Sequence, residues 1–114
     1  MADGDLFDWG RRQNHLRVAF EAFHAENPYF YKMFAHYTRE MIDAGHRNLS
    51  ARLIFHHIRW MTKMRKPIDP EDTSPFGPFK VNNNYSPFYA RMFMDDYPEY
   101  DGFFRTRDAA ADDE

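Results

Sequence analysis

The chain has 114 residues, no cysteine and a formal net charge of −3, which is enough sequence for about one domain. The lack of cysteine excludes disulfides, thiolate chemistry and Cys-based zinc sites. Twelve Phe, seven Tyr and seven Met, with few Val, Leu or Ile, favour a core of packed helices over one dominated by a sheet.

Charge is distributed unevenly along the chain. Residues 1–8 and 108–114 are rich in acids and are expected to form a flexible acidic N-terminus and a disordered acidic tail. Residues 9–107, predicted to be a single helical domain, carry fifteen Lys and Arg against eleven Asp and Glu, and residues 47–68 hold six of these cations and no acid. No segment resembles a signal peptide or a membrane span, so a cytoplasmic protein without membrane contact is expected.

Apolar spacing predicts two helices in the first part of the chain. The first begins at about Trp9 and ends near Asn27, because Pro28 disfavours helical geometry in the residue before it. Asn27-Pro28 also reads as N-cap and first residue of the second helix. Gly45 stands where a glycine commonly follows a helix end.

A third helix is predicted from the N-cap Ser50 to about Met64. Its apolar residues form one seam, which Leu53 and Trp60 are expected to widen.

The rest of the chain predicts a connector, a helix and a short β-ribbon. Four prolines and a glycine make residues 65–78 a connector. An extended piece over 79–82 precedes a helix over 86–97, which Ser86-Pro87 opens. Residues 103–107 alternate enough to predict a short strand paired with 79–82. Three to four packed helices with this ribbon give a mainly α (α+β), winged-helix-like fold, although the connector is longer than a helix-turn-helix allows.

The first functional signal is a row of cations on the third helix. Arg52, His56, Arg59, Lys63 and Lys66 follow a 4-3-4-3 spacing, which places them on one face opposite the apolar seam, with Lys66 just past the helix. Such a row suits a phosphate backbone. The alternative interpretation is an ordinary solvated face.

The second signal is the segment F-K-V-N-N-N-Y-S-P-F-Y-A-R, which places amides and hydroxyls at the positive end of the fourth helix. The asparagines could equally serve only to shape a turn. Of the aromatic residues, which mostly suit a core, Tyr89 is expected at the surface. The last strand offers either a wing tip or a charged strand edge. Together with the helical row, the predicted nucleic-acid-binding residues are Lys80, Asn83, Asn84, Tyr85, Ser86, Tyr89, Arg91, Arg105 and Arg107.

Catalytic and metal-binding patterns are missing from the sequence. The six histidines include no pair at i, i+4 spacing, and no hydrolase or phosphate-loop motif occurs. A non-enzymatic protein with no metal site and no cofactor is therefore expected. His57 is predicted to be a partly buried core histidine.

Four segments between Phe20 and Arg107 resemble a group of short uncharacterised proteins encoded by phages, prophages and bacteria. The segments are F-E-A-F-H-A-E-N-P, N-L-S-A-R-L-I-F-H-H-I-R-W, F-K-V-N-N-N-Y-S-P-F-Y-A-R and Y-P-E-Y-D-G-F-F-R-T-R. The asparagine triplet and the later G-F-F-x-x-R are the most specific of these features. The resemblance implies a compact phage-type accessory protein and brings no catalytic residue with it.

Two functions are compatible with these patterns. The leading prediction is a non-enzymatic protein that binds double-stranded DNA, with Arg52, Arg59 and Lys63 on phosphates and residues 84–91 near the groove. The alternative is a small interaction module or inhibitor that binds a host protein, for example as an anti-defence factor, through aromatic and Met anchors. The oligomeric state stays open, a homodimer included.

Overall fold

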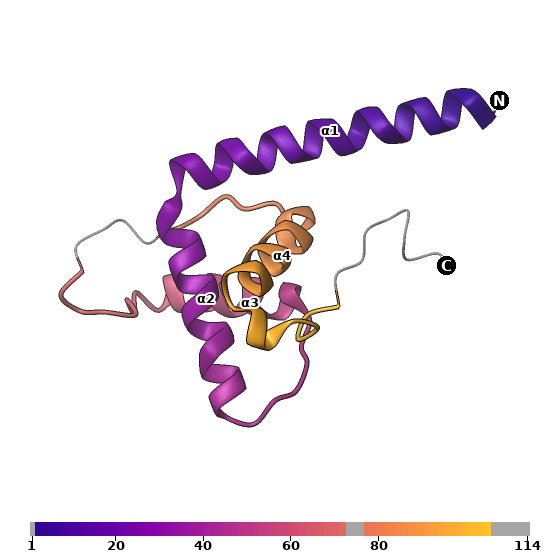
Figure 1. Ribbon diagram of the computed structural model, residues 1–114. Helices are drawn as coiled ribbons and strands as arrows, with labels where there is room; N and C mark the ends of the chain where they lie inside the picture. Colours follow the sequence, from indigo (N-terminus) through magenta and orange to yellow (C-terminus); the bar gives the residue numbers. More distant parts are fainter. Residues whose placement is uncertain (1, 73–76, 106–114) are drawn as a thin grey trace.

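The computed structural model describes residues 2–72 and 77–105, with side chains from Trp9 onward. These ranges contain four α-helices: α1 (Ala2–Glu26), α2 (Pro28–Asp43), α3 (Ala51–Lys63) and α4 (Ser86–Asp96). Two short 3-10 helices, η1 (Asn83–Tyr85) and η2 (Pro98–Tyr100), flank α4. Helices α2, α3 and α4 pack together, while α1 lies across one side of them and its N-terminal half projects past them (Figure 1).

The chain turns between α1 and α2 at Asn27-Pro28, as the sequence predicts. The proline is the first residue of α2, where its missing N–H costs no hydrogen bond. Asn27 occupies the predicted N-cap position, but its side chain makes no capping hydrogen bond to α2. Its Nδ2 instead donates to the carbonyl of Phe23 at 3.0 Å, which secures the end of α1.

Helices α2 and α3 both end in a residue with left-handed backbone geometry. Gly45 follows α2 with φ +102°, and Arg65 follows α3 with φ +56°. After α3 the N–H of Lys66 donates to the carbonyl of Met61 at 3.1 Å, which satisfies one of the last free carbonyls of the helix. A residue with a Cβ costs about 1–2 kcal/mol in this geometry, so Arg65 is strained where Gly45 is not.

The core is a cluster of aromatic rings around Tyr89, which is 0 % exposed. Its ring centroid lies 4.9 Å from that of Phe20 in α1 and 5.2 Å from that of Phe30 in α2. Its hydroxyl group hydrogen-bonds to Nδ1 of His24 at 3.3 Å, and burial raises the pKa of Tyr89. The predicted surface position of Tyr89 is therefore wrong. The buried stripe of α4 runs through Ser86, Tyr89, Ala90 and Phe93, the i, i+3, i+4, i+7 spacing of a core face.

The predicted β-ribbon and the winged-helix-like fold are also wrong. The described residues contain no strand, and their one β-bridge is an isolated parallel pair between Leu49 and Phe104. Phe103 and Phe104 do not alternate between core and solvent but are both buried. They anchor the chain beside the start of α3 instead of pairing with residues 79–82.

Side-chain contacts hold the extended segment 79–82 in place. The Phe79 ring packs edge-on against Phe30, with the ring centroids 5.3 Å apart. Just before this segment, Gly77 has φ +136°, and a Cβ on Gly77 would lie 2.8 Å from Cγ2 of Thr62 in α3. Glycine is thus needed for both the backbone geometry and the close approach to α3.

Candidate functional site

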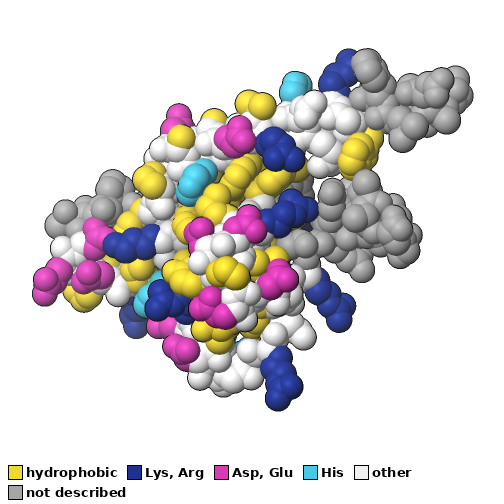
Figure 2. Space-filling view, viewed as in Figure 1, with side chains coloured by type: hydrophobic (Ala, Val, Ile, Leu, Met, Phe, Trp, Pro, Cys, Tyr) yellow, Lys and Arg dark blue, Asp and Glu magenta, His cyan; other side chains and the backbone are white. Residues whose placement is uncertain are grey.

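A groove of about 700 Å³ lies between α1 and the N-terminal ends of α3 and α4. The described residues of its lining include no acid and five arginines, which are Arg12, Arg17, Arg52, Arg91 and Arg105. Apolar side chains complete the lining, among them Leu16, Pro87 and Phe88. In the space-filling view, a band of hydrophobic side chains lies between α1 and α4, and both basic and acidic side chains lie along its edges (Figure 2).

Four separate parts of the chain bring the five arginines together. Helix α1 supplies Arg12 and Arg17, and the packing of Leu16 against the core sets how this helix faces the groove. Arg52 and Arg91 stand in the first two turns of α3 and α4. Arg105 directly follows the buried Phe103 and Phe104, so its backbone is anchored at the edge of the groove.

Described carboxylates do not neutralise these arginines. The ion pairs between described residues join Lys32 to Asp72 and His36 to Glu40, and neither pair lines the groove. The positive ends of the α3 and α4 dipoles point to the same region and add to its potential. The groove is therefore a concentrated positive site on a chain of net charge −3.

The aromatic ring of Phe88 lies at the boundary of the groove with a neighbouring hollow. The guanidinium carbons of Arg17 and Arg91 lie 5.8 and 5.9 Å from its centroid, within cation–π range. Asp95 and Asp96 line the neighbouring hollow, so the acid-free lining ends there.

Asp96 at that boundary is held by another residue. Its Oδ2 accepts a hydrogen bond from the Tyr31 hydroxyl at 2.5 Å. Burial, together with this bond, raises the pKa of Tyr31.

One member of the predicted cationic row on α3 is engaged within the protein. Arg59 turns onto the chain before α4, where its Nη2 donates to Oδ1 of Asn83 at 2.6 Å and to the carbonyl of Val81 at 3.1 Å. His56 and Lys63 are exposed, and Lys66 lies past the end of α3. Arg52 is the only member of the row that lines the groove.

The asparagine triplet is occupied by contacts within the chain. Oδ1 of Asn82 accepts from the backbone N–H of Asn84 at 2.9 Å and caps η1. Asn83 receives Arg59, and Oδ1 of Asn84 accepts from Nη2 of Arg52 at 3.3 Å. These contacts favour the interpretation of the triplet as a structural turn, with Asn84 also lining the groove.

The other predicted site residues separate into groove residues and residues placed elsewhere. Arg91, Arg105 and the mostly buried Ser86 line the groove. Tyr85 is buried in the core, and Lys80 is exposed outside the groove lining. Arg107 lies outside the described residues.

Sequence reasoning missed the contribution of α1. Arg12, Gln13 and Arg17 all line the groove. A usable signal was present, because residues 9–20 contain three arginines and no acid. This second acid-free stretch is shorter than the one over residues 47–68.

Helix α3 also carries an apolar stripe that faces solvent. Leu53, Trp60 and Met64 are 48 %, 59 % and 47 % exposed, and their spacing places them on one face of the helix. The prediction that Leu53 and Trp60 widen the core seam is therefore wrong.

The histidine beside this stripe behaves as predicted. His57 is partly buried, with its ring centroid 4.5 Å from that of Tyr37. Burial raises the pKa of Tyr37 to about 12.

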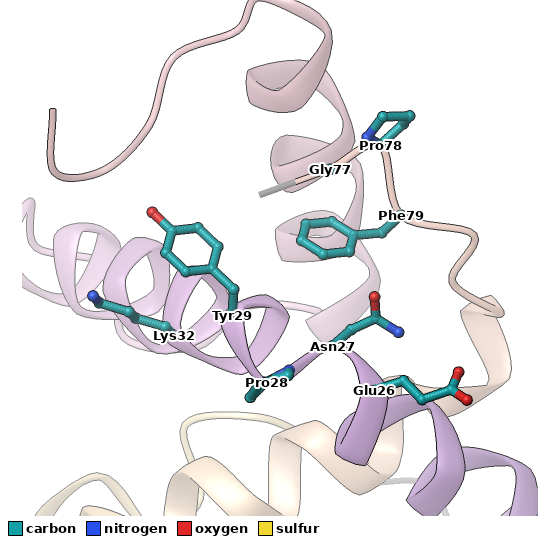
Figure 3. Close-up of a pocket in the computed structure, with 8 residues that line it drawn as sticks. All are labelled: Glu26, Asn27, Pro28, Tyr29, Lys32, Gly77, Pro78 and Phe79. Atoms are coloured by element: carbon teal, nitrogen blue, oxygen red, sulfur yellow. The ribbon is translucent and has the colours of Figure 1, made fainter. Parts of the chain in front are cut away.

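A smaller hollow of about 410 Å³ lies between the start of α2 and residues 77–79 (Figure 3). Tyr29 and Phe79 line it together with Glu26 and Lys32, which carry opposite charges. This hollow therefore lacks the one-sided charge of the arginine groove. Among the described residues, no group of three His, Cys, Asp or Glu is placed to hold a metal ion.

Comparisons with protein families, with curated proteins and with solved structures give no match for this chain. The described helices include none whose length and hydrophobicity would allow it to cross a bilayer.

Proposed function

We propose that this chain is a non-enzymatic nucleic-acid-binding protein that holds phosphate groups in the arginine groove. The observation that carries the proposal is the convergence of five arginines from four separate parts of the fold, with no acid among the described residues of the lining. Arginine is the side chain best suited to phosphate, because its planar fork donates two parallel hydrogen bonds.

The groove replaces the α3 row as the proposed binding surface. Arg59, which the sequence assigns to a phosphate, already makes two hydrogen bonds within the protein. If Arg59 bound a ligand instead, Asn83 and Val81 would lose their hydrogen-bond donor. The groove arginines carry no such internal ion pairing with described carboxylates, so they retain their charge for a ligand.

Two charge-reversed variants test this assignment. The groove variant Arg12→Glu/Arg105→Glu alters two exposed arginines in the groove lining, and the control Lys63→Glu/Lys66→Glu alters two exposed lysines on the α3 side. Both change the net charge by the same amount, so a difference between them reports position and not overall charge. Affinity is measured by fluorescence anisotropy with labelled single-stranded and duplex oligonucleotides at low salt.

We expect the groove variant to bind at least tenfold more weakly than the wild-type chain and the control to lose about threefold or less. Equal losses in both variants would remove the assignment to the groove, and a larger loss in the control would return the binding surface to α3. Wild-type chain that retains no oligonucleotide at micromolar concentration would end the proposal.

A second candidate function rests on the solvent-facing stripe of Leu53, Trp60 and Met64. Aromatic and Met side chains are enriched at the centres of protein interfaces, which supports a protein-binding module. Trp60→Ala should then abolish stoichiometric, nuclease-resistant binding to a partner protein while leaving oligonucleotide affinity unchanged. If Trp60→Ala and the wild-type chain retained the same partner equally, the stripe would have no such role.

A further inference from the structure

We infer that the arginine groove takes single-stranded nucleic acid in preference to duplex, with a base stacked at Phe88; this rests on the proposed function. The lining is chemically mixed, because Leu16, Pro87 and Phe88 stand among the five arginines. A ligand that fits it must present flat apolar surface and negative charge at the same place.

Single strands and duplexes differ in this respect. A duplex keeps the faces of its bases stacked inside and presents phosphates and base edges outward. A single strand exposes base faces beside its phosphates, and its binding proteins commonly combine a positive groove with aromatic rings. The apolar part of the lining would contribute nothing to a duplex that rests on the rim of the groove.

Phe88 has the surroundings expected of a stacking residue. Its ring is stacked on Phe20, with the centroids 4.8 Å apart and the planes 14° from parallel, so its orientation is fixed from the core side. It is only partly buried, and it lines both the groove and the neighbouring hollow. The guanidinium carbons of Arg17 and Arg91 lie 5.8 and 5.9 Å from its centroid, so positive charge for the phosphates of a bound strand is close to the ring.

The decisive experiment compares three probes of about 15 nucleotides. These are a labelled single strand of mixed sequence, the duplex of the same sequence, and an abasic strand with the same number of phosphates. We expect the wild-type chain to bind the single strand at least tenfold more tightly than the duplex and at least fivefold more tightly than the abasic strand.

Phe88 is tested by two substitutions that separate stacking from folding. Phe88→Leu should weaken binding of the single strand at least fivefold and leave the abasic strand unaffected, whereas Phe88→Tyr should restore the wild-type affinity. Circular dichroism and thermal unfolding identify variants that are folded at the assay temperature. The comparison of the three probes uses only the wild-type chain, so its result does not depend on whether a variant folds.

The possible results separate this inference from the proposed function. Duplex bound as tightly as single strand, or abasic strand bound as tightly as base-bearing strand, would overturn the inference while nucleic-acid binding stood. No binding to any of the three probes would remove both. An unchanged affinity in folded Phe88→Leu would overturn the role of the ring.

Discussion

Arg59 is predicted to hold α3 to the chain before α4 and not to contact a ligand, and Arg59→Ala tests this directly. The substitution removes two hydrogen bonds from a charged donor, to Asn83 at 2.6 Å and to Val81 at 3.1 Å. Such bonds contribute about 1.5–3 kcal/mol each when well buried. Arg59 is only partly buried, and both acceptors can turn to water, so we expect a total loss of about 2 kcal/mol.

A loss of this size corresponds to a fall in Tm of roughly 8 °C in a chain of this length. Urea unfolding followed by circular dichroism gives the free energy directly. Lys63→Ala is the matched control, because it removes an exposed cation from the same helix and should change stability by less than about 0.5 kcal/mol. Arg59→Lys should recover part of the loss, since an ammonium group lacks the fork that reaches two acceptors together.

Oligonucleotide affinity completes the test of Arg59. Measured well below the Tm of the variant, it should stay within about threefold of wild type, because Arg59 is not part of the groove lining. If Arg59→Ala were as stable as Lys63→Ala, the proposed role of Arg59 in holding α3 to the chain before α4 would be refuted. A large loss of affinity in folded Arg59→Ala would return this residue to the binding surface.

Three further predictions concern stability. Tyr89→Phe removes the hydroxyl that bonds to His24 and should lower the free energy of unfolding by about 1 kcal/mol; a fully stable variant would contradict that bond. Arg65→Gly relieves the positive φ after α3 and should raise the free energy of unfolding by about 0.5–1 kcal/mol in urea titrations, and a loss would argue against this geometry. The pKa of Tyr37 is raised to about 12, so the unfolded chain releases this proton from about pH 10 while the folded chain retains it. Stability should therefore fall between about pH 10 and 12, by roughly 2–3 kcal/mol from this group. Alkaline unfolding with tyrosinate absorbance checks this fall, and constant stability across that range would contradict it.

Local chemistry made several helix boundaries predictable from the sequence, but α1 begins at Ala2 and not near Trp9, so residues 2–8 are helical and not a flexible segment. Pro28 and Ser50 mark helix starts at the positions that the structure shows, and Gly45 marks the end of α2. Each signal depends on backbone geometry within a few residues, so no knowledge of the packing is needed. The Ser50 hydroxyl, for example, accepts from the N–H of Arg52 at 3.1 Å, as an N-cap should.

The errors concern contacts between distant parts of the chain. Residues 103–107 predicted a strand, but Phe103 and Phe104 are both buried and lie beside the start of α3. Tyr89 could not be assigned to the core because aromatic residues surround most of α4, so periodicity alone leaves its direction open.

The groove was only partly predictable for the same reason. Arg52, Arg91 and Arg105 were identified as candidate binding residues, but their grouping with Arg12 and Arg17 depends on where α1 crosses α3 and α4. Sequence spacing within one helix cannot show where another helix crosses it. It instead grouped Arg52 with Arg59, which is held by Asn83 and Val81 and does not line the groove.

The central claim is that phosphates bind in the groove, and the salt dependence of single-strand binding tests it most directly. Each neutralised phosphate contributes about 0.7 to the slope of log K against log salt. Arg12→Gln/Arg105→Gln should therefore flatten the wild-type slope by about 1.4, while Lys63→Gln/Lys66→Gln should leave it unchanged. A slope that is equally flattened in both variants, or unchanged in the groove variant, would contradict the account.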